Sequence, residues 1–278
     1  MQKRDSLGYT LSVAAILCVA CSLAVSTAAV SLRDRQEANV ALDQQKNILD
    51  ATGLAIGEYG VQASELSSKE IEALDAYISA KLVNLQTGDY VGDDQSLGSY
   101  SLVEEAADPD KSIPIVEPKF NPGEPRRPNV MKVYFVKKPG SDKILQVVLP
   151  VFGKGLWGTL YGYLALKSDL ETIQGLTFYQ HKETPGLGGE VDNPRWKAMW
   201  DGRKLYGPSK EPKAFVFKGP APKDNAYAVD GLSGATITSR GVTNLIRYWA
   251  SDDGYRTFLD KLKIEIENDK SSSSEGDK

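Results

Sequence analysis

The chain has 278 residues, a formal net charge of −4, two cysteines and one histidine. A chain of this length folds into one large domain or two smaller ones, and its negative charge gives no electrostatic basis for binding nucleic acid. With so few cysteine and histidine side chains it cannot build a Cys/His zinc site or a four-thiolate iron–sulfur cluster, so any redox chemistry requires an organic cofactor or partner subunits.

Residues 6–32 contain no charged side chain. As a helix they would be about 40 Å long, which exceeds the roughly 30 Å of a bilayer core, so a tilted transmembrane helix is expected here. Residues 1–5 would then form a short cytoplasmic N-terminus. The alternative is a cleaved signal peptide, because Lys3 and Arg4 precede the apolar run and small residues follow it.

Residues 33–129 are expected to form membrane-proximal helices and a Pro-rich connector. A helix at residues 33–54 is expected to stop near Gly53, since glycine is common at helix C-termini. A capping-box pattern at residues 67–70 predicts the start of a second helix, whose apolar residues recur at helical spacing: Ile71, Leu74, Ile78 and Leu82. Five prolines between residues 114 and 128 predict an extended, unpacked segment from residue 88 to 129.

Residues 130–266 switch to short runs of β-branched and aromatic residues, which predict strands. The expected strands are residues 130–136, 144–149, 159–166, 176–179, 214–217 and 226–229. Helices are expected from residues 168–171, from Pro194, and in two pieces after the last strand. The polar residues 267–278 are expected to be a disordered tail. The fold class is therefore α+β, with one N-terminal transmembrane helix followed by a domain whose mostly antiparallel sheet is flanked by helices.

Residues 230–239 join the last short strand to a helix through a turn that contains glycine and hydroxyl side chains. Such a turn collects unsatisfied backbone N–H groups and the positive end of a helix dipole, which together favour a phosphate. The alternative is an ordinary helix start with Thr238 or Ser239 as the N-cap residue.

Two further segments have the composition of ligand-binding loops. Residues 181–190 directly follow a strand and hold three glycines in four positions, which permits positive φ angles and close approach to a flat ligand. Thr184 and Leu187 are expected to cover an aromatic ring, although an ordinary Pro-Gly turn has the same composition. In residues 154–158 the indole of Trp157 is expected to stack on a ring system, with core packing as the alternative.

The sequence Asp-Gly-Leu-Ser-Gly-Ala-Thr at residues 230–236 resembles the flavinylation motif of the sodium-translocating NADH:quinone reductase and its electron-transport relatives. In that family a separate flavin transferase esterifies FMN through its phosphate to the last hydroxyl residue of the motif. The resemblance therefore implies covalent FMN on Thr236. An electron relay needs no catalytic base, and no metal ligands are expected. The expected cofactor-binding residues are Thr236, Asp230, Ser233, Gly234, Ala235, Thr238, Trp157, His181, Glu183, Thr184, Gly186, Leu187 and Gly188.

Four segments are similar to the C subunits of that reductase family and follow the family order: residues 41–49, 154–166, 175–196 and 233–238. The resemblance implies a bacterial inner-membrane subunit whose flavin domain lies outside the cytoplasm. It would relay electrons between an iron centre in the membrane and the flavin of a neighbouring subunit, with the other membrane subunits and the flavin transferase as partners. The alternatives are the related flavoprotein of an Rnf-type electron-transport complex, which shares two of the motifs, and a periplasmic adaptor that has lost its cofactor.

Overall fold

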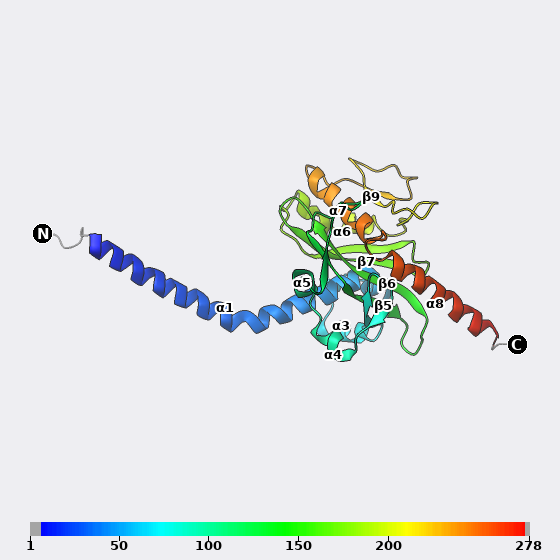
Figure 1. Cartoon of the computed structure of the whole chain (residues 1–278), viewed down its shortest axis with the longest axis horizontal. Helices are drawn as coiled ribbons and strands as arrows, with labels where there is room; N and C mark the ends of the chain where they lie inside the picture. Colours follow the sequence, from blue (N-terminus) through cyan, green and yellow to red (C-terminus); the bar gives the residue numbers. More distant parts are fainter. Residues whose placement is uncertain (1–6, 276–278) are drawn as a thin grey trace. The chain divides into compact units, whose positions relative to one another are not determined.

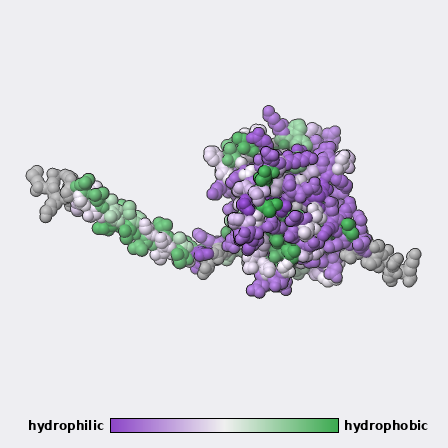
Figure 2. Space-filling model, viewed as in Figure 1, coloured by the Kyte–Doolittle hydropathy of each residue, from purple (hydrophilic) through white to green (hydrophobic). Residues whose placement is uncertain are grey.

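The computed structural model describes residues 7–275. The chain divides into two compact units, one ending at Gln45 and the other beginning at Lys46. Helix α1 (Leu7–Thr52) begins in the first unit, where the side chains of residues 7–33 are exposed and mostly apolar (Figure 1, Figure 2). This stretch of 27 residues is long and apolar enough to cross a membrane, which confirms the predicted apolar helix. The predicted N-terminal segment 1–5 lies outside the described residues.

The last turns of α1 belong to the second unit and pack on one face of its sheet. Ile48 and Ala51 are buried against Val148 and Tyr163. Gly53 ends the helix with φ of 68°, a left-handed conformation that glycine adopts without steric strain, so the predicted stop is confirmed. The next helical elements are α2 (Leu54–Tyr59), the 3-10 helix η1 (Ala63–Glu65) and α3 (Ser68–Asp75).

The predicted capping box opens α3, but this helix is shorter than expected. The Ser67 hydroxyl and the Glu70 carboxylate each accept a hydrogen bond from the other residue's backbone N–H. The predicted continuation through Ile78 and Leu82 is wrong, because both residues lie in strand β1 (Ile78–Asn84). All of β1 pairs with strand β5, and this pairing outweighs a helical spacing of only a few apolar residues.

The segment predicted as an unpacked connector is partly folded. It contains β2 (Tyr90–Val91), α4 (Asp94–Ser99), α5 (Leu102–Ala107), β3 (Ser112–Pro114) and β4 (Arg126–Pro128). Strand β2 joins the main sheet beside β1, whereas β3 and β4 pair with each other as a separate ribbon. Pro114 and Pro128 each end one of these strands, a position that proline tolerates because no further ladder hydrogen bond is needed there.

The main sheet has six antiparallel strands in the order β2-β1-β5-β6-β7-β8. The remaining strands of this sheet are β5 (Val130–Lys137), β6 (Ile144–Lys154), β7 (Thr159–Lys167) and β8 (Ile173–Gln180). Their side chains alternate between the two faces. Val147 and Leu149 join the core that includes α7, whereas Val148 joins the smaller cluster with the end of α1. The four strands predicted here are confirmed, and β6 and β8 are longer than expected.

Residues 168–171 form a tight turn between β7 and β8, so the helix predicted there is wrong. Neighbouring antiparallel strands are joined by short connections, and β7 and β8 are paired almost to their ends. The Asp169 carboxylate accepts hydrogen bonds from the N–H groups of Glu171 and Thr172, which gives the local turn that Asp favours.

The rest of the second unit covers one face of the sheet and supplies its longest loops. Its elements are η2 (Gly188–Asp192), α6 (Pro194–Ala198), β9 (Phe215–Val216), β10 (Ala228–Val229) and α7 (Thr236–Trp249). Strands β9 and β10 pair in parallel, apart from the main sheet. Val242, Leu245 and Trp249 of α7 are buried where this helix packs against β6. The predicted order of strand, turn and helix is confirmed.

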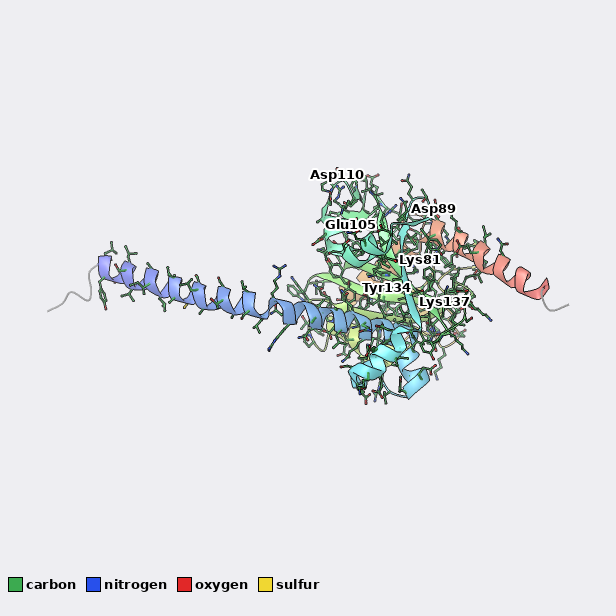
Figure 3. All side chains as sticks on the ribbon, turned by 90° about the horizontal axis from the view of Figure 1, so that it is seen from below. Lys81, Asp89, Glu105, Asp110, Tyr134 and Lys137 are labelled. Atoms are coloured by element: carbon green, nitrogen blue, oxygen red, sulfur yellow. The ribbon has the colours of Figure 1, made fainter. Side chains whose placement is uncertain are left out.

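Helix α8 (Arg256–Glu275) packs at the β1–β2 edge of the sheet. Asp89 of the turn between these strands, labelled in Figure 3, pairs with Lys261 of α8. The Tyr90 hydroxyl donates to Glu265 at 3.1 Å. The helix continues to Glu275, so it covers most of the segment predicted to be a disordered tail; residues 276–278 lie outside the described part of the chain. A charged and polar composition does not exclude a helix, so composition alone could not predict this element.

Candidate functional site

Three loops that are far apart in the sequence meet at the start of α7. They are residues 154–158 after β6, residues 181–188 after β8, and residues 230–238 leading into α7. The Glu183 carboxylate joins all three, since it accepts from the Trp157 N–H at 2.8 Å and from the Thr238 hydroxyl at 2.5 Å. The segments that the sequence singled out therefore lie together in one site.

Thr236 is the first residue of α7, and its side chain is exposed. The preceding residue is Ala235, whose buried methyl group cannot accept a hydrogen bond, so the first-turn N–H groups have no side-chain cap. The alternative in which Thr238 or Ser239 caps the helix is wrong, because both residues lie inside α7 and their hydroxyls bond elsewhere. The helix start is therefore open to an added acceptor.

The turn before α7 is held by contacts to neighbouring loops. The Asp230 carboxylate accepts from the Ala221 N–H at 2.8 Å, and the Asp230 carbonyl accepts from Trp196 Nε1 at 2.9 Å. Gly234 has φ of 69°, and a Cβ at this position would lie 2.8 Å from Leu187 Cδ2. Glycine thus meets both a conformational and a space requirement there. Asp230 and Gly234 shape the turn, while the neighbouring Ser233 is exposed.

A pocket of about 210 Å³ opens beside Thr236, between the first turns of α7 and residues 216–219. Lys218 and Arg240 line it and make this surface, called the cationic pocket below, positive. Neither residue was predicted. Arg240 lies one helical turn after Thr236, so the i, i+4 spacing contains a signal for it. Lys218 comes from another loop, and only the fold brings it near.

Four apolar side chains remain exposed around the same site, and they are called the apolar rim below: Leu156, Trp157, Leu187 and Ile237. Their exposed fractions lie between 44% and 66%. A cluster of solvent-exposed apolar side chains is typical of a ligand or partner site, because their contact with water is unfavourable. Here the cluster is built from three separate loops. Trp157 and Leu187 were predicted, whereas nothing in the composition distinguishes the other two from core residues.

Glu183 was predicted to contact the cofactor, but its carboxylate is turned into the protein. The residue is 5% exposed. Burial raises the pKa of Glu183, yet the hydrogen bonds from the Thr238 hydroxyl and from the backbone N–H groups of residues 156–158 hold that pKa below its usual value. The side chain is therefore an anion at neutral pH, compensated by protein donors.

His181 is likewise engaged within the loop. Its Nδ1 accepts from the Glu183 N–H at 3.1 Å, which leaves the proton on Nε2, and Nε2 lies 2.7 Å from Asp192 Oδ2. The hydrogen bond to Asp192 raises the pKa of His181, and partial burial opposes this. Both ring nitrogens thus have protein partners, so the histidine shapes the loop. Among the described residues, no group of three or more His, Cys, Asp and Glu side chains is arranged to hold a metal ion.

The loop after β8 turns tightly between these groups. The Thr184 carbonyl accepts from the N–H groups of Leu187 and Gly189, at 3.1 and 2.9 Å. Gly186 has φ of 77°, a region that glycine enters freely. Gly188 is required for a different reason, because a Cβ there would lie 2.5 Å from an oxygen of the buried glutamate. Gly188 is buried, whereas Thr184 and Gly186 are exposed.

Residues 155–251 match the FMN-binding domain family. This match begins at the second residue of the first of the three loops and ends after α7, so it contains all of the candidate site except Lys154. Solved structures share the fold. The crystal structure of NqrC from Shewanella oneidensis has a TM-score of 0.69 at 30% identity, covering 80% of this chain and 98% of that one. The C subunit of the Na+-translocating NADH-quinone reductase from Parabacteroides distasonis has a TM-score of 0.60 at 29% identity, with 82% and 96% coverage.

Curated proteins are similar to the chain over nearly its whole length. The C subunit of the Na+-translocating NADH-quinone reductase of Pseudomonas aeruginosa is 44% identical over 267 residues, which cover 95% of this chain and 98% of that protein. The corresponding protein of Yersinia pestis is 38% identical over 262 residues, covering 94% and 95%. The chain therefore belongs to the family of C subunits of the Na+-translocating NADH-quinone reductases.

Proposed function

We propose that this chain is the FMN-carrying electron relay of a sodium-pumping NADH:quinone reductase, with the flavin bound covalently to Thr236 through a phosphoester. The observation that carries the proposal is the position of Thr236. Its exposed hydroxyl stands on the first residue of α7, beside the cationic pocket and the apolar rim. A hydroxyl in this position is accessible to a transferase, and each end of FMN has a matching surface next to it.

The phosphate end of FMN fits the start of α7. A phosphoester on the Thr236 oxygen keeps a negative charge, and a negative charge at an exposed helix N-terminus is stabilised by roughly 0.3–1 kcal/mol. Lys218 and Arg240 in the cationic pocket add to this stabilisation. The turn held by Asp230 keeps the donors in place, so little has to reorganise when the phosphate is attached.

The ring end of FMN fits the apolar rim. Trp157 and Leu187 present apolar surface from two different loops, and covering them with a flat ring removes that surface from water. When bound, a flavin supplies the chemistry, since it accepts one or two electrons, while the protein binds, orients and tunes it. No side chain has to act as an acid or base in such a relay, which agrees with the internal contacts of His181 and Glu183.

The relay would work inside a membrane complex. The apolar part of α1 serves as the anchor. Electrons would pass between an iron centre in the membrane and the flavin of a neighbouring subunit, as the family resemblance implies. A separate flavin transferase acts on the outer side in this family, as the resemblance implies, which supports an orientation with residues 1–5 in the cytoplasm and the flavin domain outside. Protease digestion of sealed inner-membrane vesicles measures this orientation, and digestion of the flavin domain only from the cytoplasmic face would contradict it.

Replacement of Thr236 tests the attachment. The full chain and its Thr236→Ala and Thr236→Ser variants are each produced together with a flavin transferase and separated on a denaturing gel. Flavin fluorescence that survives denaturation should be absent from Thr236→Ala and can persist in Thr236→Ser, because the ester needs a hydroxyl. Ser233→Ala is the matched control, since it removes an exposed hydroxyl three residues earlier and should stay fluorescent. A fluorescent Thr236→Ala chain would exclude this attachment site.

A further inference from the structure

Glu183 lies where the three loops meet, and its side chain is turned into the protein. The residue is 5% exposed, and its two oxygens accept from different loops. Oε1 accepts from the Trp157 N–H at 2.8 Å, and Oε2 accepts from the Thr238 hydroxyl at 2.5 Å. Because a buried carboxylate is very unfavourable without donors, these contacts fix both loops to it.

Two glycines complete the enclosure of this carboxylate. A Cβ on Gly155 would lie 2.6 Å from Glu183 Oε1, and a Cβ on Gly188 would lie 2.5 Å from Glu183 Oε2. Neither glycine has a positive φ, so glycine is needed at both positions for space and not for backbone conformation. The backbone therefore approaches the carboxylate more closely than any other residue type would permit.

The residues that Glu183 contacts lie next to the surfaces of the proposed flavin site. The backbone N–H of Trp157 donates to Glu183, and the indole of the same residue is part of the exposed apolar rim. Leu187 follows Glu183 in the same tight loop and reaches the Cβ position of Gly234. Thr238 lies two residues after Thr236 in α7, and two residues are about 200° apart around a helix. Thr238 is accordingly buried while Thr236 is exposed.

We propose that Glu183 is a positioning residue for the flavin: its carboxylate holds the Trp157 loop and the Leu187 loop in a fixed place relative to Thr236, so that the ring of the attached FMN keeps one orientation. This proposal rests on the proposed attachment of FMN to Thr236. A tether at the phosphate alone leaves the ring free to turn about the flexible ribityl chain. The orientation must therefore come from the surfaces at the ring end, and Glu183 fixes those surfaces to the tether.

The test compares variants of the full flavinylated chain in detergent. Visible circular dichroism of the flavin and its fluorescence anisotropy report the orientation and mobility of the ring, which a purely structural role of Glu183 would leave unchanged in folded protein. Thr238→Val removes one donor at nearly constant shape, and it should keep the covalent flavin while losing most of both signals. Thr238→Ser keeps the hydroxyl and should retain the wild-type signals.

Thr177→Val is the matched control. The buried Thr177 hydroxyl also donates a hydrogen bond, to the Asn47 carbonyl at 3.0 Å, but it lies outside the flavin site, so wild-type signals are expected. Wild-type signals in folded, flavinylated Thr238→Val would overturn the proposal. Loss of covalent flavin from folded Thr238→Val would also overturn it, because the contact would then serve the transferase. If Thr238→Val does not fold, Gly155→Ala disturbs the same carboxylate from the other side. Wild-type signals in folded, flavinylated Gly155→Ala would also overturn the proposal.

An effect of charge can be separated from an effect of position. Glu183→Gln removes a negative charge and would raise the midpoint potential of a nearby flavin in either case, whereas Glu183→Asp keeps the charge and shortens the side chain. Positioning predicts loss of the ring signals in both variants. A shifted potential in Glu183→Gln together with wild-type signals in Glu183→Asp would show that only the charge matters and would refute positioning. A wild-type chain without covalent flavin would instead refute the proposed function, and this proposal with it.

Discussion

At Gly241, helix α7 lies close to the backbone of the loop that carries Trp157. A Cβ on Gly241 would lie 2.2 Å from the Lys154 carbonyl oxygen and 3.3 Å from Gly155 Cα. Both neighbours are backbone atoms, so no side-chain rotation relieves the contact. Gly241→Ala therefore has to displace either the helix that carries Thr236 or the loop.

Two opposing effects set the size of this change. Alanine is favoured over glycine inside a helix by about 0.5–1 kcal/mol. Overpacking costs about 1–3 kcal/mol, and a rigid contact with the backbone belongs at the upper end of that range. We expect a net loss of about 2 kcal/mol, which lowers the Tm of a domain of this size by roughly 4–8 °C.

Thermal unfolding of the full chain, followed by far-UV circular dichroism, measures this shift. Gly98→Ala is the matched control, because Gly98 lies in helix α4 and, apart from its chain neighbours and the backbone of its own helix, nothing lies within 4 Å of its Cβ position. That variant should be neutral or slightly stabilising, since only helix propensity changes. A Tm of Gly241→Ala at or above the wild-type value would refute the close packing of α7 on the loop.

Three further predictions concern the flavin site and the turn before β8. Leu187→Ala should shift the flavin absorption bands or midpoint potential without loss of covalent flavin, because this side chain belongs to the apolar rim and not to the phosphate end. An unchanged spectrum and potential would show that Leu187 does not contact the ring. Arg240→Ala should lower the fraction of chain that the transferase flavinylates in a fixed time, because the cationic pocket loses a positive charge. In-gel flavin fluorescence per unit protein measures this fraction, and an undiminished fraction would count against a role of Arg240 in phosphate binding. Burial raises the pKa of Asp169, but hydrogen bonds from Thr172 and from backbone N–H groups outweigh it and lower the pKa to about 2. The carboxylate thus contributes stability above its ordinary pKa of 3.8 and loses this contribution as the pH falls toward 2, so Asp169→Asn should destabilise the chain near neutral pH and approach the wild type in acid. Denaturant unfolding across this range checks it, and a difference that does not change with pH would contradict it.

Local sequence patterns predict much of the sheet, because alternation and turn residues depend on neighbours in the chain. They fail where distant pairing decides the structure. Ile78 and Leu82 fit a helical spacing, but pairing with β5 makes them part of a strand. Residues 168–171 have a capping-box sequence, but two adjacent antiparallel strands leave room only for a turn.

The candidate site is likewise only partly predictable from local sequence. Its loops stand out by composition, and Thr236 by the resemblance of its motif, because both signals are local. The partner of each side chain is not local. Glu183 and Thr238 are 55 residues apart, and they meet only because β8 ends near the start of α7. Lys218 lines the cationic pocket from a separate segment after β9, and β9 pairs with β10, the strand that leads into α7.

Mass spectrometry of a single peptide tests the attachment of FMN to Thr236 most directly. Trypsin releases residues 224–240 as one peptide, which contains the aliphatic hydroxyls of Ser233, Thr236, Thr238 and Ser239 and the phenol of Tyr227. In a chain purified under denaturing conditions after production with a flavin transferase, we expect the mass of this peptide to increase by that of FMN less one water. Fragmentation should place the added mass on Thr236. An unmodified peptide, or the added mass on any other residue of it, would contradict a phosphoester at Thr236.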